Sequence, residues 1–247
     1  MTDPMYRTIL LFDIEQYGAR DDVEQAFLRR LLYEIADATL LAAGAEEGAG
    51  LRADRGDSVM ELIDIGVSVP ALLKILLTET PALLHSKNRL LAASARMRLR
   101  IVLSSGYVAI DELDGWVGSD LNHAVRLLNS DSLRDALKQR DDDSVLCVSD
   151  GIYQGVARHN HLGIRRDDFH RVTVPTKEGP TVAWLHGVPG VEESEDPSPT
   201  APGTSAGSAG TVPNETRIGR DQYGVSGGIV HGGLNFGAGP AGRGDRS

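Results

Sequence analysis

Two aspartates near the start of the chain stand where apolar runs meet a turn. Asp13 ends the apolar run of residues 9–12, and Asp57 lies in the short turn of residues 55–57. A strand that is buried on both faces should not end on an unpaired acid, because burying a lone charge is costly. Two carboxylates at neighbouring strand ends can hold two divalent cations, which bind phosphate oxygens and activate a hydroxyl. Each aspartate taken alone is better explained as a structural turn residue.

A third group of residues makes this pair informative. In the segment 118–128, Asn122 and Arg126 are four residues apart, so on a helix both project from one side. The expected core face carries Leu121, Ala124, Val125 and Leu128. An amide can orient a ribose, and a guanidinium can stabilise charge on a phosphoryl oxygen. In isolation, a solvated polar face would look the same.

The surrounding sequence alternates between strand and helix patterns. Extended runs are expected at residues 8–12, 97–110, 144–149, 169–174 and 181–186, together with a β-hairpin over 54–65. Helices are expected at 22–44, 69–85 and 119–130. The first helix would bury the residues that recur at helical spacing, which are Val23, Phe27, Leu31, Ile35 and Ala38. The pattern predicts one α/β (α+β) domain with a mixed, largely antiparallel sheet flanked by helices.

The composition bounds what this domain can do. The 247 residues are 41% hydrophobic and 24% charged, which is typical of a globular domain. A formal net charge of -10 argues against nucleic acid as a partner, because nucleic-acid binders present a basic face. The lone cysteine, Cys147, excludes an intrachain disulfide and a multi-cysteine metal site. Since no run approaches the ~20 apolar residues of a membrane span and no signal-peptide pattern is present, we expect a cytoplasmic protein without membrane contacts.

The composition changes sharply after residue 187. The remaining residues hold 14 of the 28 glycines and too little apolar surface to offset the entropy of ordering them. We therefore predict a globular domain over 1–187, a disordered linker over 188–216 and a glycine-rich tail over 217–247. The tail spaces apolar residues among its glycines, and we interpret it as an interaction segment for an effector protein.

The three motifs occur in an order that is typical of one enzyme family. The run ILLFDI, the hairpin RGDSVMELI and the segment GSDLNHAVR resemble, in that order, the catalytic domain of class III nucleotidyl cyclases, the adenylyl and guanylyl cyclase homology domain. Each motif is weak alone, whereas the ordered set is fairly specific. The resemblance covers roughly residues 5–187 and implies a ferredoxin-like palm.

The resemblance also implies roles for the singled-out residues. Asp13 and Asp57, with the backbone carbonyl of Ile14, would bind two Mg²⁺ or Mn²⁺ ions. The ribose 3'-hydroxyl of a nucleoside triphosphate would then attack the α-phosphorus and expel pyrophosphate. Asn122 would orient the ribose, and Arg126 would stabilise the transition state.

The family's sites are shared between subunits, which implies a homodimer here. One subunit supplies the metal carboxylates and the other supplies the asparagine and arginine, so a monomer would hold no complete site. Lys177, in the segment before the last expected strand, matches the family's phosphate-binding lysine.

The positions that read the base depart from the family. Adenylyl cyclases have a lysine and an aspartate where this chain has Ala53 and Gly115, and the guanylyl glutamate and cysteine are missing too. Three explanations stay open: a base read by Arg52, Asp54, Asp114 or Trp116, a pyrimidine substrate, or a vestigial pocket. The compact layout resembles the bacterial cyclases that make cyclic UMP or cyclic CMP in anti-phage defence, and we favour a pyrimidine. We assign substrate binding to Ala53, Arg55, Gly115, Trp116 and Lys177.

Three functions compete on these grounds. The first is a cyclase that makes a 3',5'-cyclic monophosphate. The second is an inactive cyclase-like module that dimerises or senses a nucleotide and recruits an effector through its tail. The third, a nucleotide transferase related to polymerases, is disfavoured because the helix with Asn122 and Arg126 has no counterpart there.

Overall fold

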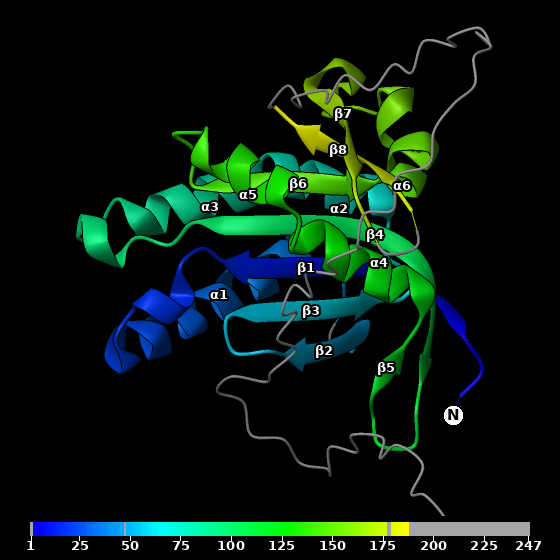
Figure 1. Ribbon diagram of the computed structural model, residues 1–247, viewed down its shortest axis with the longest axis horizontal. Coiled ribbons are helices and arrows are strands. Elements are labelled where there is room, and N and C mark those ends of the chain that lie inside the picture. Colours follow the sequence, from blue (N-terminus) through cyan, green and yellow to red (C-terminus); the bar gives the residue numbers. More distant parts are fainter. Residues whose placement is uncertain (1, 47, 177–178, 188–247) are drawn as a thin grey trace, which may run out of the picture.

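An eight-stranded sheet forms the centre of the computed structural model, which describes residues 2–46, 48–176 and 179–187 (Figure 1). The strand order is β2-β3-β1-β4-β6-β8-β7, and β5 pairs with β4 beside this path. The β4–β6 pair is parallel and the other pairs are antiparallel. The strands are β1 (Met5–Ile14), β2 (Gly50–Asp54), β3 (Ser58–Ile63), β4 (Leu99–Ile110), β5 (Trp116–Val117), β6 (Ser144–Ser149), β7 (Phe169–Val174) and β8 (Thr181–His186). The predicted mixed, largely antiparallel sheet is confirmed.

Helices cover both faces of the sheet (Figure 1). One face, the α1 face, packs against α1 (Asp22–Ala42), α2 (Val69–Leu77), α3 (Glu79–Asn88) and α6 (Asp150–Gly155). The other face, the α4 face, packs against α4 (Ser119–Leu128) and α5 (Asp131–Lys138). Short 3₁₀ turns are η1 (Tyr17–Ala19), η2 (Ala93–Ala95), η3 (Ala157–His159) and η4 (Arg166–Asp168).

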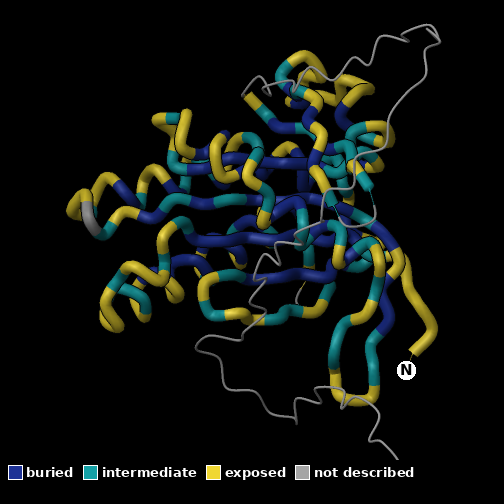
Figure 2. Tube along the Cα trace, viewed as in Figure 1, coloured by how far each residue is buried: buried dark blue, intermediate teal, exposed yellow. Residues whose placement is uncertain are grey.

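Strand β1 is central, and its residues from Thr8 to Ile14 are buried (Figure 2). It pairs with β3 on one side and β4 on the other, so its backbone groups are used along most of its length. Leu10 and Phe12 face the α1 side, whereas Ile9 and Leu11 face the α4 side. Burial on both faces explains why the sequence of this strand is a continuous apolar run.

The expected β-hairpin is confirmed as β2 and β3. Its turn places Gly56 at φ +87°, a conformation that side-chain-bearing residues rarely adopt. The amide of Gly56 donates to Oδ1 of Asp54 at 2.7 Å, and the amide of Arg55 donates to the carbonyl of Ser58 at 2.9 Å. These bonds place Asp57 at the tip, beside the end of β1.

Two helix predictions were wrong in detail. The single helix expected over 69–85 is two helices, because Pro81 has no N–H to continue the hydrogen bonds of α2 and the chain turns at Thr78. In α1 the expected core residues Val23 and Phe27 are 79% and 37% exposed. The buried stripe instead comprises Leu28, Leu31, Leu32, Ile35, Ala36 and Thr39.

Two helices were not predicted, and two predicted segments fall outside the described residues. Helices α5 and α6 were not predicted; they are eight and six residues long and follow Ser130 and Ser149, which cap them. The linker over 188–216 and the tail over 217–247 lie beyond the described part of the chain. No helix among the described residues has the length and apolar character needed to cross a membrane.

Candidate active site

The side chain of Asp13 lies next to an arginine that sequence reasoning did not assign to the site. Asp13 is 6% exposed, and Arg100 lies directly opposite it on β4. Nε of Arg100 donates to Oδ1 of Asp13 at 2.9 Å, and Nη2 donates to the same oxygen. Burial raises the pKa of Asp13 to about 6, although Arg100 acts in the opposite direction. Because burial disfavours the ionised carboxylate, a further cation beside Asp13 would stabilise it.

Asp57 lies at the same end of the sheet. Its negative charge also raises the pKa of Asp13, and its backbone carbonyl accepts a hydrogen bond from the amide of Ile14 at 3.0 Å. The Asp57 side chain is exposed, whereas Ile14 is buried. The structure thus brings the two predicted carboxylates to one sheet end, with the Ile14 backbone beside them.

This donor set fits hard divalent cations. Carboxylate and carbonyl oxygens suit Mg²⁺ and Mn²⁺, and substrate phosphate oxygens and water would complete the coordination. No group of three or more histidine, cysteine or acidic side chains gathers as a metal site among the described residues. Any ions at Asp13 and Asp57 would therefore be held by few protein ligands, as is usual where a nucleotide supplies the rest.

Arg100 could have been found from one signal in the sequence. Arg98 directly precedes β4 and Arg100 lies within it, and the two arginines alternate with Leu99 and Ile101 in an apolar stretch. A buried cation of this kind needs an anionic partner. The sequence does not identify the partner, because Asp13 and Arg100 are 87 residues apart.

Asn122 and Arg126 line a second site, a pocket of about 290 Å³. Its other walls come from the connection between β7 and β8, through Thr176 and Thr181. The described lining contains no carboxylate, so its polar groups are an amide, an imidazole, a guanidinium and hydroxyls. Such a set suits an anion or a sugar. Lys177 belongs to this connection but is not among the described residues.

Helix α4 holds the amide and the guanidinium in place. Its buried residues are Leu121, Ala124, Leu127 and Leu128, whereas Val125, expected in the core, is only partly buried. Oδ2 of Asp120 accepts a hydrogen bond from the amide of Tyr107 at 2.8 Å. This close approach needs Gly106, because a Cβ there would lie 2.1 Å from Asp120.

The two sites do not merge within one chain. Neither Asp13 nor Asp57 lines the pocket that contains Asn122 and Arg126. The carboxylates lie where β1 ends, whereas the pocket lies over the α4 face (Figure 1). Each site therefore holds half of the groups that the sequence motifs predict.

Two of the residues considered for base reading face away from the pocket. Arg52 points to the α1 face, where Nε donates to Oε1 of Glu61 at 2.5 Å and Nη2 donates to Oδ1 of Asp37 at 2.6 Å. Asp54 forms an ion pair with Arg29 of α1. Both side chains have partners on the α1 side, so the structure gives no support to base reading by Arg52 or Asp54.

The remaining base positions are of two kinds: Ala53, Gly115 and Trp116 are apolar or small, whereas Arg55 and Asp114 are charged. Ala53 and Trp116 are partly buried and pack against the apolar cluster of the α4 face. Gly115 is enclosed by Asp111, whose Oδ1 accepts hydrogen bonds from the amides of Leu113 and Gly115. A Cβ at residue 115 would lie 2.6 Å from Asp111. Arg55 and Asp114 are exposed.

Comparison with known proteins decides the fold. An adenylate/guanylate cyclase/hydrolase from Silicibacter pomeroyi superposes with a TM-score of 0.54 at 18% identity, over 75% of this chain and 98% of that one. The chain has the fold of a nucleotidyl cyclase catalytic domain. A guanylyl cyclase matches this cyclase fold with a TM-score of 0.53 at 16% identity, over 78% of this chain and 96% of that one. A bacterial light-regulated adenylyl cyclase gives 0.52 at 16% identity, over 75% and 91%.

Sequence comparison alone finds no relative. No protein-family model matches the chain, and no curated protein matches it. The likeness to cyclases is therefore one of fold, at identities of 16–18%.

Proposed function

We propose that this protein is a metal-dependent nucleotidyl cyclase that converts a nucleoside triphosphate to a 3',5'-cyclic monophosphate and pyrophosphate. The observation that carries the proposal is that one chain with a cyclase fold holds both half-sites, at separate places. Asp13 and Asp57 meet at one sheet end, and Asn122 and Arg126 line a pocket whose described lining contains no carboxylate. Neither pair contributes to the apolar core, and clusters of such polar groups are typical of functional sites.

Each residue has a defined part in this reaction. Asp13, Asp57 and the Ile14 carbonyl would hold two divalent cations, which supply Lewis-acid activation of the ribose 3'-hydroxyl and neutralise the triphosphate. Asn122 orients the ribose, so that its 3'-oxygen attacks the α-phosphorus in line with the leaving oxygen. The bond to the bridging oxygen breaks, pyrophosphate leaves, and the hydroxyl proton passes to solvent. Arg126 stabilises the charge that develops on the phosphoryl oxygens.

Arg100 adds a positive charge beside the carboxylates. Without added cations it compensates Asp13 through two hydrogen bonds. Once cations take over that role, its guanidinium is free to donate to the triphosphate. The proposal therefore includes Arg100 as a binding residue at this half-site.

The separation of the half-sites supports a homodimer with two shared sites. A head-to-tail pair can place the carboxylates of one subunit against the Asn122 pocket of the other. Lys177 would contribute to phosphate binding from the β7–β8 connection.

We propose a pyrimidine nucleotide, UTP or CTP, as the substrate. Ala53 and Gly115 offer no side chain that could read a purine, and Arg52 is engaged on the α1 face. Trp116 is partly buried on the α4 face and offers an aromatic surface for the base. A cyclic pyrimidine nucleotide would then act as a signal, for which we propose anti-phage defence.

The decisive experiment is a product assay. The purified protein is incubated with Mn²⁺ and each of ATP, GTP, CTP and UTP, and cyclic monophosphates are measured by mass spectrometry. We expect one cyclic pyrimidine nucleotide, lost in Asp57→Ala and retained in Asp135→Ala, which removes an exposed acid on α5. A folded protein that makes no cyclic product from any of the four would overturn the proposal and favour the binding module.

A further inference from the structure

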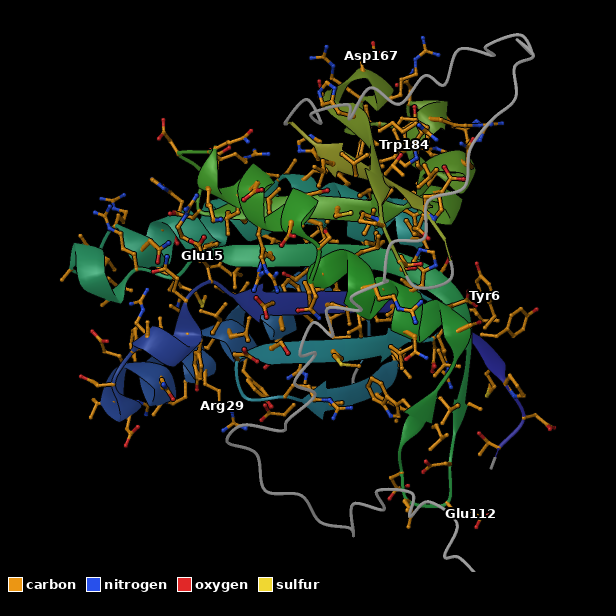
Figure 3. The ribbon with its side chains drawn as sticks, in the orientation of Figure 1. Tyr6, Glu15, Arg29, Glu112, Asp167 and Trp184 are labelled. Atoms are coloured by element: carbon orange, nitrogen blue, oxygen red, sulfur yellow. The ribbon has the colours of Figure 1, made fainter. Side chains whose placement is uncertain are left out.

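A second cavity, of about 490 Å³, lies at the end of the sheet where β1 ends. Its walls come from α2 and α3, from the loop before β4, from the loop between α5 and β6, and from the end of β8. These elements meet on the left of Figure 1, and Figure 3 places Glu15, which directly follows β1, at the same end. None of its lining residues belongs to the candidate active site.

Hydrogen bonds fix the two loops that form this cavity. Asn88, which is 2% exposed, donates to the carbonyl of Met97 at 2.7 Å and accepts from the Met97 amide at 2.9 Å, which pins the loop before β4. Nη2 of Arg98 donates to the carbonyls of Leu137, Arg140 and Asp142 at 2.6, 2.8 and 3.2 Å, which pins the loop after α5. The cavity is therefore preformed, as ligand sites usually are.

Two of the three arginines in the cavity lining, Arg89 and Arg96, have guanidinium groups that are not engaged by the neighbouring acids. Nη2 of Arg140 contacts Asp142 at 2.5 Å, and Asp143 lies 3.5 Å from His85, so these two acids have local partners. The third acid, Asp141, is exposed, as are Arg89 and Arg96. Within the described residues, neither of those two guanidiniums forms a hydrogen bond or an ion pair.

The rest of the lining is apolar. Leu76, Leu77, Pro81 and Leu146 form the floor of the cavity. Burial and the charge of Arg140 lower the pKa of His186, so its imidazole adds a neutral wall at pH 7. Guanidinium groups at the mouth and hydrocarbon at the floor match a ligand with an anionic end and an apolar body.

We propose that this cavity is a regulatory site for a phosphate monoester with an apolar or planar body. The phosphate would bind Arg89 and Arg96, since arginine matches phosphate oxygens in a bidentate manner. The body would rest on the leucine floor. The cavity volume is in the range of small-molecule sites, which is about 300–1,000 Å³.

The hydrogen bonds of Arg98 connect this cavity with the end of β1. Arg98 holds the α5–β6 loop through three carbonyls, and its Nη1 also donates to Oε2 of Glu15 at 3.2 Å. Glu15 is two residues after Asp13. Arg96 is two residues before Arg98, so a ligand held by Arg96 would stabilise the segment that carries Arg98 and, through Glu15, the position of the β1 end. Ligand binding does not depend on the proposed function, but this coupling rests on the proposed metal site. It must be reciprocal, so that the ligand tightens cation binding as much as the cation tightens ligand binding.

Binding is tested by calorimetric titration of the full chain with phenyl phosphate. We expect saturable binding that weakens about tenfold or more when both arginines are removed in Arg89→Ala/Arg96→Ala. Both side chains are exposed, so this variant should fold. Arg171→Ala removes an exposed arginine on β7 and should bind as the unaltered protein does. The absence of saturable binding, or its loss in Arg126→Ala instead, would overturn the proposal.

Coupling is tested by titrating Mn²⁺ with and without saturating phenyl phosphate. We expect phenyl phosphate to tighten Mn²⁺ binding several-fold, and expect Arg98→Lys to remove this effect while phenyl phosphate still binds. Equal Mn²⁺ affinities in both titrations would refute the regulatory role. A protein that binds phenyl phosphate but makes no cyclic nucleotide would refute only the proposed function.

Discussion

The carboxylate of Asp13 and the guanidinium of Arg100 face each other across β1 and β4 and share two hydrogen bonds. Their side chains are 9% and 13% exposed, so solvent screens this pair only weakly. The pair satisfies a buried charge in the protein alone. Both hydrogen bonds use Oδ1 of Asp13, so Arg100 supplies the positive charge that a bound cation would otherwise provide.

Replacing Arg100 should lower stability, and Mn²⁺ should restore it. In Arg100→Met the Asp13 carboxylate remains buried without a partner, which we expect to lower the free energy of unfolding by about 3 kcal/mol in urea titrations. Mn²⁺ should raise the melting temperature more in this variant than in the unaltered protein, because the ion replaces the lost charge. The double variant Asp13→Asn/Arg100→Met should regain stability and lose the response to Mn²⁺. An equal response in all three proteins would argue against a cation at Asp13.

Mixing two inactive variants should restore cyclase activity. Asp57→Ala lacks a metal ligand, and Arg126→Ala lacks the cation of the other half-site. If the sites are shared, a mixed dimer has one intact site, so random mixing should recover about a quarter of full activity. The measurement is product formation after the variants are unfolded and refolded together, with each variant refolded alone as the control. Sites contained within one chain would give no recovery.

Arg52 should affect stability and not base preference. Arg52→Met leaves Glu61, which is 4% exposed, without its partner, and we expect a loss of about 2 kcal/mol in unfolding free energy. The ratio of cyclic products from competing triphosphates should stay unchanged. Trp116→Ala, in contrast, should raise the KM for the preferred triphosphate, because it removes the aromatic surface of the base site. A changed product ratio in Arg52→Met would place this arginine at the base.

Cys147 should be unreactive in the folded protein. It is 2% exposed in β6, and burial raises the pKa of its thiol to about 12, so almost no thiolate exists at pH 8. Alkylation followed by mass spectrometry should be slow without denaturant and complete in urea. Because the chain has one cysteine, labelling would report unfolding directly. Rapid labelling of the folded protein would contradict the burial of this strand.

The fold could be predicted where the apolar pattern of a segment and its turn residues indicate the same element. The strands at β1 and β4 and the hairpin of β2 and β3 follow from apolar runs and from a glycine that accepts φ +87°. The face of α1 could not be predicted as well, because the predicted and the observed apolar stripes overlap at Leu31 and Ile35, whereas Val23 is largely exposed. Helices α5 and α6 are short, and periodicity is weak over so few residues.

The types and the order of the candidate-site residues could be read from the sequence, because Asp13, Asp57, Asn122 and Arg126 lie in short motifs whose spacing is set by one strand, one turn and one helix. Which residues those groups meet depends on the packing of the chain. It placed Arg100 against Asp13, turned Arg52 toward α1, and separated the two half-sites within the chain. The physical reason is that alternation along a strand assigns side chains to two faces, whereas sheet order and helix packing decide what covers each face.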